Sequence, residues 1–454
     1  MRWLFKQANP ILFLAIIPAI CFLYLGYFFE RTQFDELMLL ILALSFSYGY
    51  VLMNQSRFNW RLLFSLGLAY RLIFLFSIPA LSDDFYRFIW DGLLITQGSD
   101  PFAVLPSELV QPSAFQLELL QGMNSPDYYS VYPPFLQYLF AFAAYLGGES
   151  ILMNVVFFRL PIILAEVGSF FLLRAILRKL SMSDLRAFIY FLNPLVIIEL
   201  SGNLHAEALW IFFFLMTVRM LMKSSYFMSG LLFSAAVLIK MLPLIFGPLL
   251  LFKIKPRSWH LFFLGIFIFT SLTTFTLIDP QTIHHMSTSI DLYFEKFEFN
   301  ASLYYLFSWM GKLYYGYNPI QTLGPLIAVI TGLLILAIQF SKRELNWYDV
   351  MKKFLLSITV YYLFALVVHP WYLAPLLLLA SFRSYIFPLL WSLLIFLSYH
   401  RYALGVMEES PFYLALEYFP VYALLFAELT RGEKSLFIGI KQKVFNFQST
   451  KPNQ

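Results

Sequence analysis

The sequence predicts an all-α, polytopic membrane protein, because its composition lies outside the range of soluble globular proteins. Of its 454 residues, 60% are hydrophobic, 20% are aromatic and only 13% are charged. The mean hydropathy is +0.72. Apolar runs that could cross a hydrocarbon core of about 30 Å recur along most of the chain. No stretch between them is long enough to fold as a soluble domain, so we expect one membrane-embedded domain over residues 1–454.

The charges of the loops predict about fourteen spans with both termini in the cytoplasm, because loops rich in Lys and Arg stay on that side. The basic segments are the N-terminus, 56–61, 174–186, 219–223, 253–257, 341–353 and the tail 431–454. The intervening segments, which we expect to face outward, are 29–36, 81–150, 201–207, 279–318, 369–371 and 400–410. Residues 1–60 then hold the first two spans.

The formal net charge of +5 belongs largely to these basic segments. It therefore marks topology, and we expect the lipid bilayer, and no nucleic acid, as a partner. The single cysteine, Cys21, lies in the first apolar run, so no internal disulfide can form. The sequence has no phosphate-binding or dinucleotide-binding glycine motif, so no nucleotide site is expected.

One apolar stretch breaks the alternation of sides. YPPFLQYLFAFAAYLGG, residues 132–148, is short and begins close to two prolines. If it crossed the membrane, the basic stretch 174–186 would lie outside, against the charge rule. We therefore expect a juxtamembrane helix that lies along the outer interface, or a shallow re-entrant helix, beside the other parts of segment 81–150.

The outer stretch LSDDFYRFIWDG, residues 81–92, is the main candidate site. A serine followed by Asp83 and Asp84 could simply begin a helix, since a capping hydroxyl and early acids favour a helix N-terminus. However, Arg87 and Asp91 follow at helical spacing, and a cap needs only one acid. Charges held beside a membrane are costly unless they pair or meet a polar ligand. The stretch is therefore a candidate functional site.

Other polar residues of the predicted outer side are candidates for substrate binding. They are Tyr86, Arg87, Asp91, Tyr132, His205, Glu207, Lys240, His369, His400 and Arg401. Lys240 interrupts an apolar run, so it either meets an anion or extends to the membrane surface. Arg401 suits phosphate through its planar guanidinium, although it and His400 could also be interfacial anchors. His369 could instead cap the helix that begins with Pro370.

Together these segments resemble the GT-C superfamily of membrane glycosyltransferases, and its mannosyltransferase branch most of all. The resemblance rests on the acidic pair, GSDPF (98–102), YPPFLQYLF (132–140) and the Asn-Pro span NPLVIIELSGNLHAEALW (193–210). That span normally ends in a Gly-His-Asn-Asp-like corner, but here it reads GNLHAE, with a glutamate and a displaced histidine. The resemblance extends over residues 62–430 and leaves the first two spans outside the common core.

This resemblance implies a GT-C-like fold and transfer of a hexose, with mannose as the family's sugar. The donor would be a polyprenyl-phosphate sugar, and the acceptor would be a hydroxyl of a glycan, lipid or protein. Asp83 would be the general base of an inverting reaction, with Asp84 as the second candidate. Lys240, His400 and Arg401 would hold the phosphate. The setting would be a bacterial inner membrane, with the site facing the periplasm.

We expect no cofactor and no metal, although Asp83, Asp84 and Glu207 would be the ligands if a divalent cation were used. A secondary transporter or flippase of a lipid-linked or polar substrate is the alternative function. Such proteins place charged sites near the membrane midplane, at the interface of internal repeats. Here the ionisable residues gather on one side, Glu166 being the main exception, and no internal repeat is visible.

Overall fold

The computed structural model describes residues 10–275, 277, 280–295, 297–341, 345–403, 409–432 and 438–445. Within these ranges the chain is helical and contains no β-strand, which confirms the predicted all-α class. One isolated β-bridge pairs Phe299 with Val367. Parts of the predicted N-terminal basic segment and of the tail 431–454 lie outside the described residues.

The α-helices occur along the whole described chain. They are α1 (Ile17–Tyr27), α2 (Phe34–Asn54), α3 (Trp60–Ile73), α4 (Asp84–Thr96), α5 (Ala114–Gly122), α6 (Pro134–Gly147), α7 (Ile151–Lys179), α8 (Ala187–Phe191), α9 (Glu207–Leu221), α10 (Tyr226–Val237), α11 (Gly247–Leu251), α12 (Trp259–Thr274), α13 (Pro280–Glu295), α14 (Leu303–Tyr315), α15 (Ile320–Phe340), α16 (Trp347–Phe364), α17 (Ala374–Ala380), α18 (Phe387–Leu394), α19 (His400–Ala403), α20 (Pro411–Arg431) and α21 (Ile438–Val444).

Shorter 3₁₀ and π segments connect or extend these helices. The 3₁₀ segments are η2 (Gln55–Arg57), η3 (Pro106–Glu108), η4 (Asp184–Arg186), η6 (Leu242–Phe246), η7 (Pro256–Ser258), η8 (Pro370–Leu373) and η9 (Ile395–Tyr399). The π segments are η1 (Leu12–Ile16) and η5 (Val196–Gly202).

Four helical segments of the described chain are long and apolar enough to cross a membrane: Phe34–Arg57, Ile151–Lys179, Ile320–Phe340 and Pro411–Arg431. A fifth is possible if Asp184–Phe191 and Val196–Gly202, which bend by 63° at the Asn-Pro step, form one span. The prediction of about fourteen spans is therefore not confirmed. Other apolar runs are divided into shorter helices, in part by prolines such as Pro243 and Pro370, because a proline interrupts helical hydrogen bonding.

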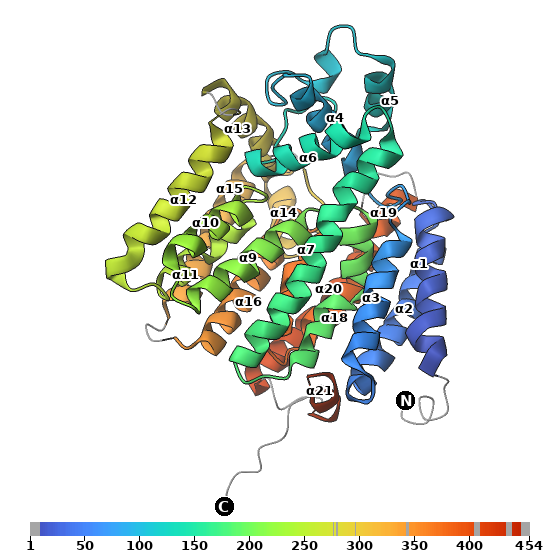
Figure 1. The fold of residues 1–454 in the computed structure, drawn as a ribbon, viewed down its shortest axis with the longest axis vertical. Helices are drawn as coiled ribbons and strands as arrows, with labels where there is room; N and C mark the ends of the chain where they lie inside the picture. Colours follow the sequence, from blue (N-terminus) through green and yellow to red (C-terminus); the bar gives the residue numbers. More distant parts are fainter. Residues whose placement is uncertain are drawn as a thin grey trace, which may run out of the picture.

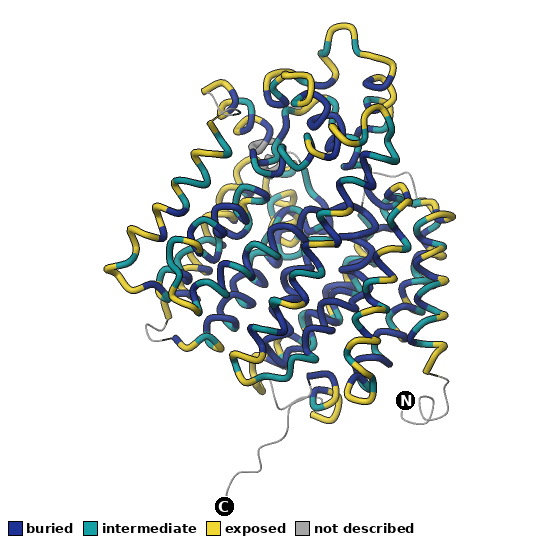
Figure 2. The backbone as a smooth tube through the Cα atoms, in the orientation of Figure 1, coloured by how far each residue is buried: buried dark blue, intermediate teal, exposed yellow. Residues whose placement is uncertain are grey.

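The burial pattern fits a helical bundle in a bilayer. The centre is formed by α8, η5 and α17, whose residues are all buried, and peripheral helices surround them (Figure 2). Large apolar side chains on α12 and α15 are exposed, among them Phe267, Leu272 and Leu333. An exposed apolar face of this kind suits contact with hydrocarbon. The chain is therefore a membrane protein.

The bundle has two distinct ends. Helices α4, α5, α6 and α13 lie at the top of Figure 1, and α21 lies at the bottom. At the α21 end, Gln55 donates a hydrogen bond to the carbonyl of Val444 at 2.6 Å, and Arg186 donates to that of Phe445 at 2.6 Å. These contacts bring the ends of two predicted basic loops to the C-terminal helix.

Helices α4 and α6 pack closely at the other end. A Cβ added at Gly92 would lie 2.3 Å from the carbonyl oxygen of Phe140, so only glycine lets the two backbones approach this far. Next to this contact the rings of Phe88 and Phe140 stack with centroids 4.6 Å apart. The packing fixes the position of α4, which begins with the acidic pair.

Candidate active site

The start of α4 leaves the carboxylate of Asp83 available. The hydroxyl of Ser82 accepts a hydrogen bond from the backbone N–H of Asp84 at 3.3 Å. Asp83 occupies the N-cap position, but its side chain makes no capping hydrogen bond. The capping interpretation of the acidic pair therefore does not account for Asp83.

Asp83 instead forms an ion pair with Arg31, whose Nη2 lies 2.7 Å from Oδ2 of the carboxylate. Arg31 lies between α1 and α2, and its guanidinium carbon is 4.5 Å from the ring centroid of Tyr402. The two paired side chains are 30% and 34% exposed, so the pair borders solvent. A ligand can reach it.

Asp84 has different partners from Asp83. Its Oδ1 accepts a hydrogen bond from the amide of Asn124 at 2.8 Å. Burial raises the pKa of the Asp84 carboxyl, while the Asn124 hydrogen bond and the charge of Lys240 lower it in part. Asp83 and Glu207 also lie within electrostatic range of Asp84. The acidic pair is thus the centre of a charged cluster.

Lys240 lies in the break between α10 and η6, as expected from the proline that follows it. Its ammonium forms a short ion pair with the Glu207 carboxylate and lies 4.3 Å from the ring centroid of Tyr372. Glu207 is buried, whereas Lys240 is partly exposed. The sequence-predicted Lys240 and Glu207 are therefore brought together next to the acidic pair.

His205 and His369 flank one indole ring. The ring centroids of His205 and Trp371 are 3.6 Å apart, and those of His369 and Trp371 are 4.3 Å apart. Burial lowers the pKa of His369 to about 3 and the pKa of His205 well below its ordinary value, with the charge of Lys240 adding to both effects. Both imidazoles are therefore neutral at physiological pH. They could offer hydrogen bonds to a ligand, but not positive charge.

Arg87 and Asp91 are buried and pair with each other at 2.7 Å. Arg87 also donates to the carbonyls of Ser125 and Tyr128 at 3.1 and 2.7 Å. Asp91 accepts from Ser130 at 2.5 Å and from Gln137 at 2.9 Å. These bonds hold the segment after α5, which carries Asn124, against α4. The geometry favours a supporting role for both residues over the substrate contact suggested by the sequence.

Two predicted tyrosines pack within the protein. The Tyr86 ring would meet a Cβ added at Gly122 of α5. Tyr132 makes edge contacts with Phe88 and Phe140, with centroids 5.2 and 5.4 Å apart. Both tyrosines therefore help to assemble α4 with its neighbours.

His400 and Arg401 were predicted as a pair that faces a ligand, but His400 is buried. Its Nδ1 lies 2.8 Å from the Leu397 carbonyl, and its Nε2 accepts from the backbone N–H of Ser410 at 3.0 Å. Arg401 donates to the Glu298 carbonyl at 3.0 Å and to the Glu409 carboxylate at 3.2 Å. With both ring nitrogens bonded inside the protein, His400 cannot face a phosphate in this arrangement.

Residues 35–254 match the family model described as alpha-(1->6)-mannopyranosyltransferase, N-terminal domain. These residues belong to that mannosyltransferase family. The chain is therefore a glycosyltransferase, as the sequence resemblance implied, and the transporter alternative is set aside. A search of curated proteins finds no match.

The part of the mannosyltransferase that matches this family contains both members of the acidic pair, together with His205, Glu207 and Lys240. Arg31, His369 and Tyr402 lie outside it. The cluster is thus built from the matched segment and from two other parts of the chain.

Sequence reasoning missed two polar residues of this cluster, Arg31 and Asn124, and a third, Glu199, whose carboxylate lies 3.6 Å from His205. Arg31 was assigned only to an outer loop, although the same charge rule places that loop and Asp83 on the same side of the membrane. Asn124 had no signal, since an amide in a long loop is not distinctive. Glu199, in η5, accepts hydrogen bonds from Tyr399 at 2.9 Å and Asn203 at 3.1 Å. Its carboxylate interrupts the apolar run VIIEL, so the sequence alone could have marked Glu199 as a candidate site residue.

Divalent cations such as Ca²⁺ and Mg²⁺ are held in proteins by oxygen donors, carboxylates above all. Within the described ranges, no three His, Cys, Asp or Glu side chains are grouped as a metal site. Glu207, the third ligand considered from the sequence, instead forms its ion pair with Lys240.

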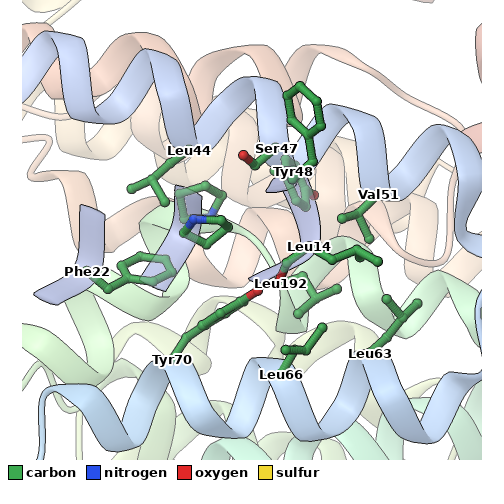
Figure 3. Close-up of a pocket in the computed structure, with 13 residues that line it drawn as sticks. Leu14, Phe22, Leu44, Ser47, Tyr48, Val51, Leu63, Leu66, Tyr70 and Leu192 are labelled. Atoms are coloured by element: carbon green, nitrogen blue, oxygen red, sulfur yellow. Dashed lines mark hydrogen bonds between the residues drawn. The ribbon is translucent and has the colours of Figure 1, made fainter. Parts of the chain in front are cut away.

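A cavity lies between α1, α2 and α3 (Figure 3), and its lining contains no residue of the charged cluster. Its lining is mostly apolar, with Ser47, Tyr48 and Tyr70 as the polar exceptions. The Tyr48 hydroxyl donates to the Ile189 carbonyl at 2.6 Å. This cavity has no charged side chain in its lining, so it cannot supply the acid–base chemistry of sugar transfer.

Proposed function

We propose that this mannosyltransferase takes mannose from a polyprenyl-phosphate donor and transfers it to an acceptor hydroxyl at the α4 end of the bundle. The observation that carries the proposal is the charged cluster, in which Asp83 and Asp84 lie beside Arg31 and the Lys240–Glu207 pair. Carboxylates can accept the acceptor proton, and cations can stabilise a departing phosphate.

In the proposed reaction, the acceptor oxygen attacks the anomeric carbon of mannose. Asp83 takes the hydroxyl proton as the new carbon–oxygen bond forms. The bond between the anomeric carbon and the phosphate oxygen breaks, and polyprenyl phosphate leaves with the bonding electrons. Lys240 stabilises the charge that develops on that phosphate. Asp84 is the second candidate for the base, because it is adjacent to Asp83 and approaches the same cluster.

The family description names an α-(1→6)-mannopyranosyl transfer. A single displacement inverts the anomeric centre. If this chain makes the α linkage in one displacement, its donor must therefore be the β-linked mannosyl phosphate. A glycan, lipid or protein hydroxyl would be the acceptor.

We place the charged cluster on the outer side of a bacterial inner membrane, facing the periplasm, with both termini in the cytoplasm. The basic residues Arg174, Arg178 and Arg186 support this orientation. Arg174 and Arg178 pair with Asp184, next to Arg186, which contacts the C-terminal segment at the end opposite α4. Positively charged loops favour the cytoplasmic side.

The test is a transfer assay with purified protein in lipid nanodiscs. Separate reactions would contain β-mannosyl polyprenyl phosphate, its α anomer or a nucleotide-linked mannose, each with a short alkyl mannoside as acceptor. We expect consumption of the β-linked lipid donor alone, and an α-(1→6) product by NMR. Transfer from the nucleotide sugar, or from the α-linked lipid with retention, would contradict the proposal.

A further inference from the structure

The first helical hairpin, α1 and α2 with their connection 28–33, packs on α19 and α20 and places its connection beside the charged cluster. The ring of Phe34 contacts those of His400 and Tyr413, with centroids 6.2 and 5.3 Å apart. Within the connection, the backbone N–H of Glu30 donates to the Gln33 side chain at 2.8 Å, and that of Gln33 donates to the Glu30 carbonyl at 2.9 Å. The packing of Phe34 and the hydrogen bonds within the connection therefore both hold it in place.

This docking brings Arg31 to Asp83. The guanidinium has an anionic neighbour and an aromatic one. The Asp83 carboxylate lies 2.7 Å from Nη2, and the Tyr402 ring centroid lies 4.5 Å from the guanidinium carbon. A planar guanidinium can donate to a carboxylate while its face lies on an aromatic ring. Tyr402 therefore restricts where Arg31 can hold the carboxylate.

An ion pair at this exposure contributes little to the stability of a fold. Its position at the acidic pair suggests a use in the reaction instead. A general base must point at the proton it takes, and a fixed cationic partner can hold the carboxylate in that direction.

We infer that Arg31 is a positioning residue for Asp83, supplied to the active site by the N-terminal hairpin. Residue 31 precedes the family match, which begins at residue 35, so this contribution comes from outside the matched domain. The inference rests on the proposed function, in which Asp83 is the base.

The experiment compares wild type with Arg31→Gln and Arg31→Lys in steady-state transfer from β-mannosyl polyprenyl phosphate. The glutamine variant keeps a hydrogen-bond donor but loses the charge. We expect its kcat to fall about tenfold or more, within the range of a weakened general base, while the KM for the donor changes by less than about twofold, since uniform substrate binding is kept. The lysine variant should recover part of kcat, because it restores the charge without the planar fork.

Arg178→Gln is the matched control. Arg178 also pairs with a carboxylate, at 2.8 Å from Asp184, but at the other end of the bundle. The kcat of Arg178→Gln should equal that of wild type. Tyr402→Leu is a second variant, and it should lower kcat in the same direction as Arg31→Gln because it releases the guanidinium.

The possible outcomes separate the role of Arg31 from the proposed mannosyl transfer. If wild type transfers mannose while Arg31→Gln keeps its kcat, the inference is overturned and the proposed function stands. If Arg31→Gln raises the donor KM with kcat unchanged, Arg31 binds the donor directly and does not act through Asp83. If wild type transfers no mannose from the lipid donor, the proposed function fails and the inference fails with it. Should Arg31→Gln not fold, an unchanged kcat in Tyr402→Leu would overturn the inference.

Discussion

The protonation of Asp84 depends on its surroundings. Burial raises the pKa of its carboxyl above the ordinary value of about 3.9. A raised pKa in the folded state means that the neutral form is favoured by folding. The corresponding stability is present below the unfolded pKa and is lost as pH rises through the folded pKa.

Asp84→Asn should therefore increase thermal stability at neutral pH, because the amide resembles the neutral acid. The gain should shrink as pH falls through the raised folded pKa, because wild-type Asp84 then becomes protonated as well. Thermal unfolding of purified wild type and variant across this pH range checks the expectation. A variant that is less stable than wild type at neutral pH would show that Asp84 is stabilised as a carboxylate.

Lys240 is the residue to which we assign the leaving phosphate. Lys240→Met should lower turnover about a hundredfold or more, since a lost charge-stabilising donor costs about 2.7 to 4 kcal/mol in the transition state. Lys223→Met, an exposed lysine beyond the far end of α9, is the control and should keep full turnover. A chelator should leave activity unchanged. Loss of activity on chelation, restored by a divalent ion, would assign the acidic pair to a metal instead.

At the scale of single residues, the sequence predicted the acidic pair, Lys240 and Glu207 as members of one site, and the structure brings them together. It could not predict the partners. Asn124 and Tyr402 reach Asp84 and Arg31 through tertiary packing, and no local pattern marks such residues. His400 was predicted to bind a ligand because it precedes Arg401 in an outer loop. In the structure its two ring nitrogens are hydrogen-bonded to Leu397 and Ser410 instead.

At the scale of elements, the contact between α4 and α6 controls how the acidic pair is presented. Gly92→Ala should destabilise the protein by about 1 to 3 kcal/mol, because its Cβ would overlap the Phe140 carbonyl in a packed interface. Gly332→Ala is the matched control, since nothing lies within 4 Å of a Cβ at that helical position. Thermal unfolding of both variants is the measurement. Equal stability of Gly92→Ala and wild type would mean that the two helices can separate freely.

The sequence indicates where helices break more clearly than how long they are. Pro243 and Pro194 account for two interruptions because proline removes a donor and clashes with the preceding turn, and the structure has breaks at both places. The number of spans was not readable, because a sum of hydropathy cannot tell one long helix from two short ones that bend inside the bundle.

At the scale of the whole molecule, the two ends of the bundle differ in charge and predict one orientation. Cysteines at Ser99 and Ser287, which are exposed near the α4 end, should react with a membrane-impermeant reagent added to intact cells. A cysteine at Ser341, exposed at the end of α15, should not react until the cells are opened. Cys21 is buried and should give little background. Reaction at Ser341 in intact cells would place the charged cluster in the cytoplasm.

Mannose transfer at the acidic pair is the central proposal for the whole molecule. The most direct measurement is kcat for wild type, Asp83→Asn and Asp84→Asn with β-mannosyl polyprenyl phosphate as donor, beside donor binding for each. We predict that Asp83→Asn loses about a hundredfold to ten-thousandfold in kcat, the usual contribution of a general base, and still binds the donor. Asp84→Asn should keep more of its activity. Wild-type turnover in both variants would contradict the account, and wild-type turnover in Asp83→Asn with loss in Asp84→Asn would move the base to Asp84.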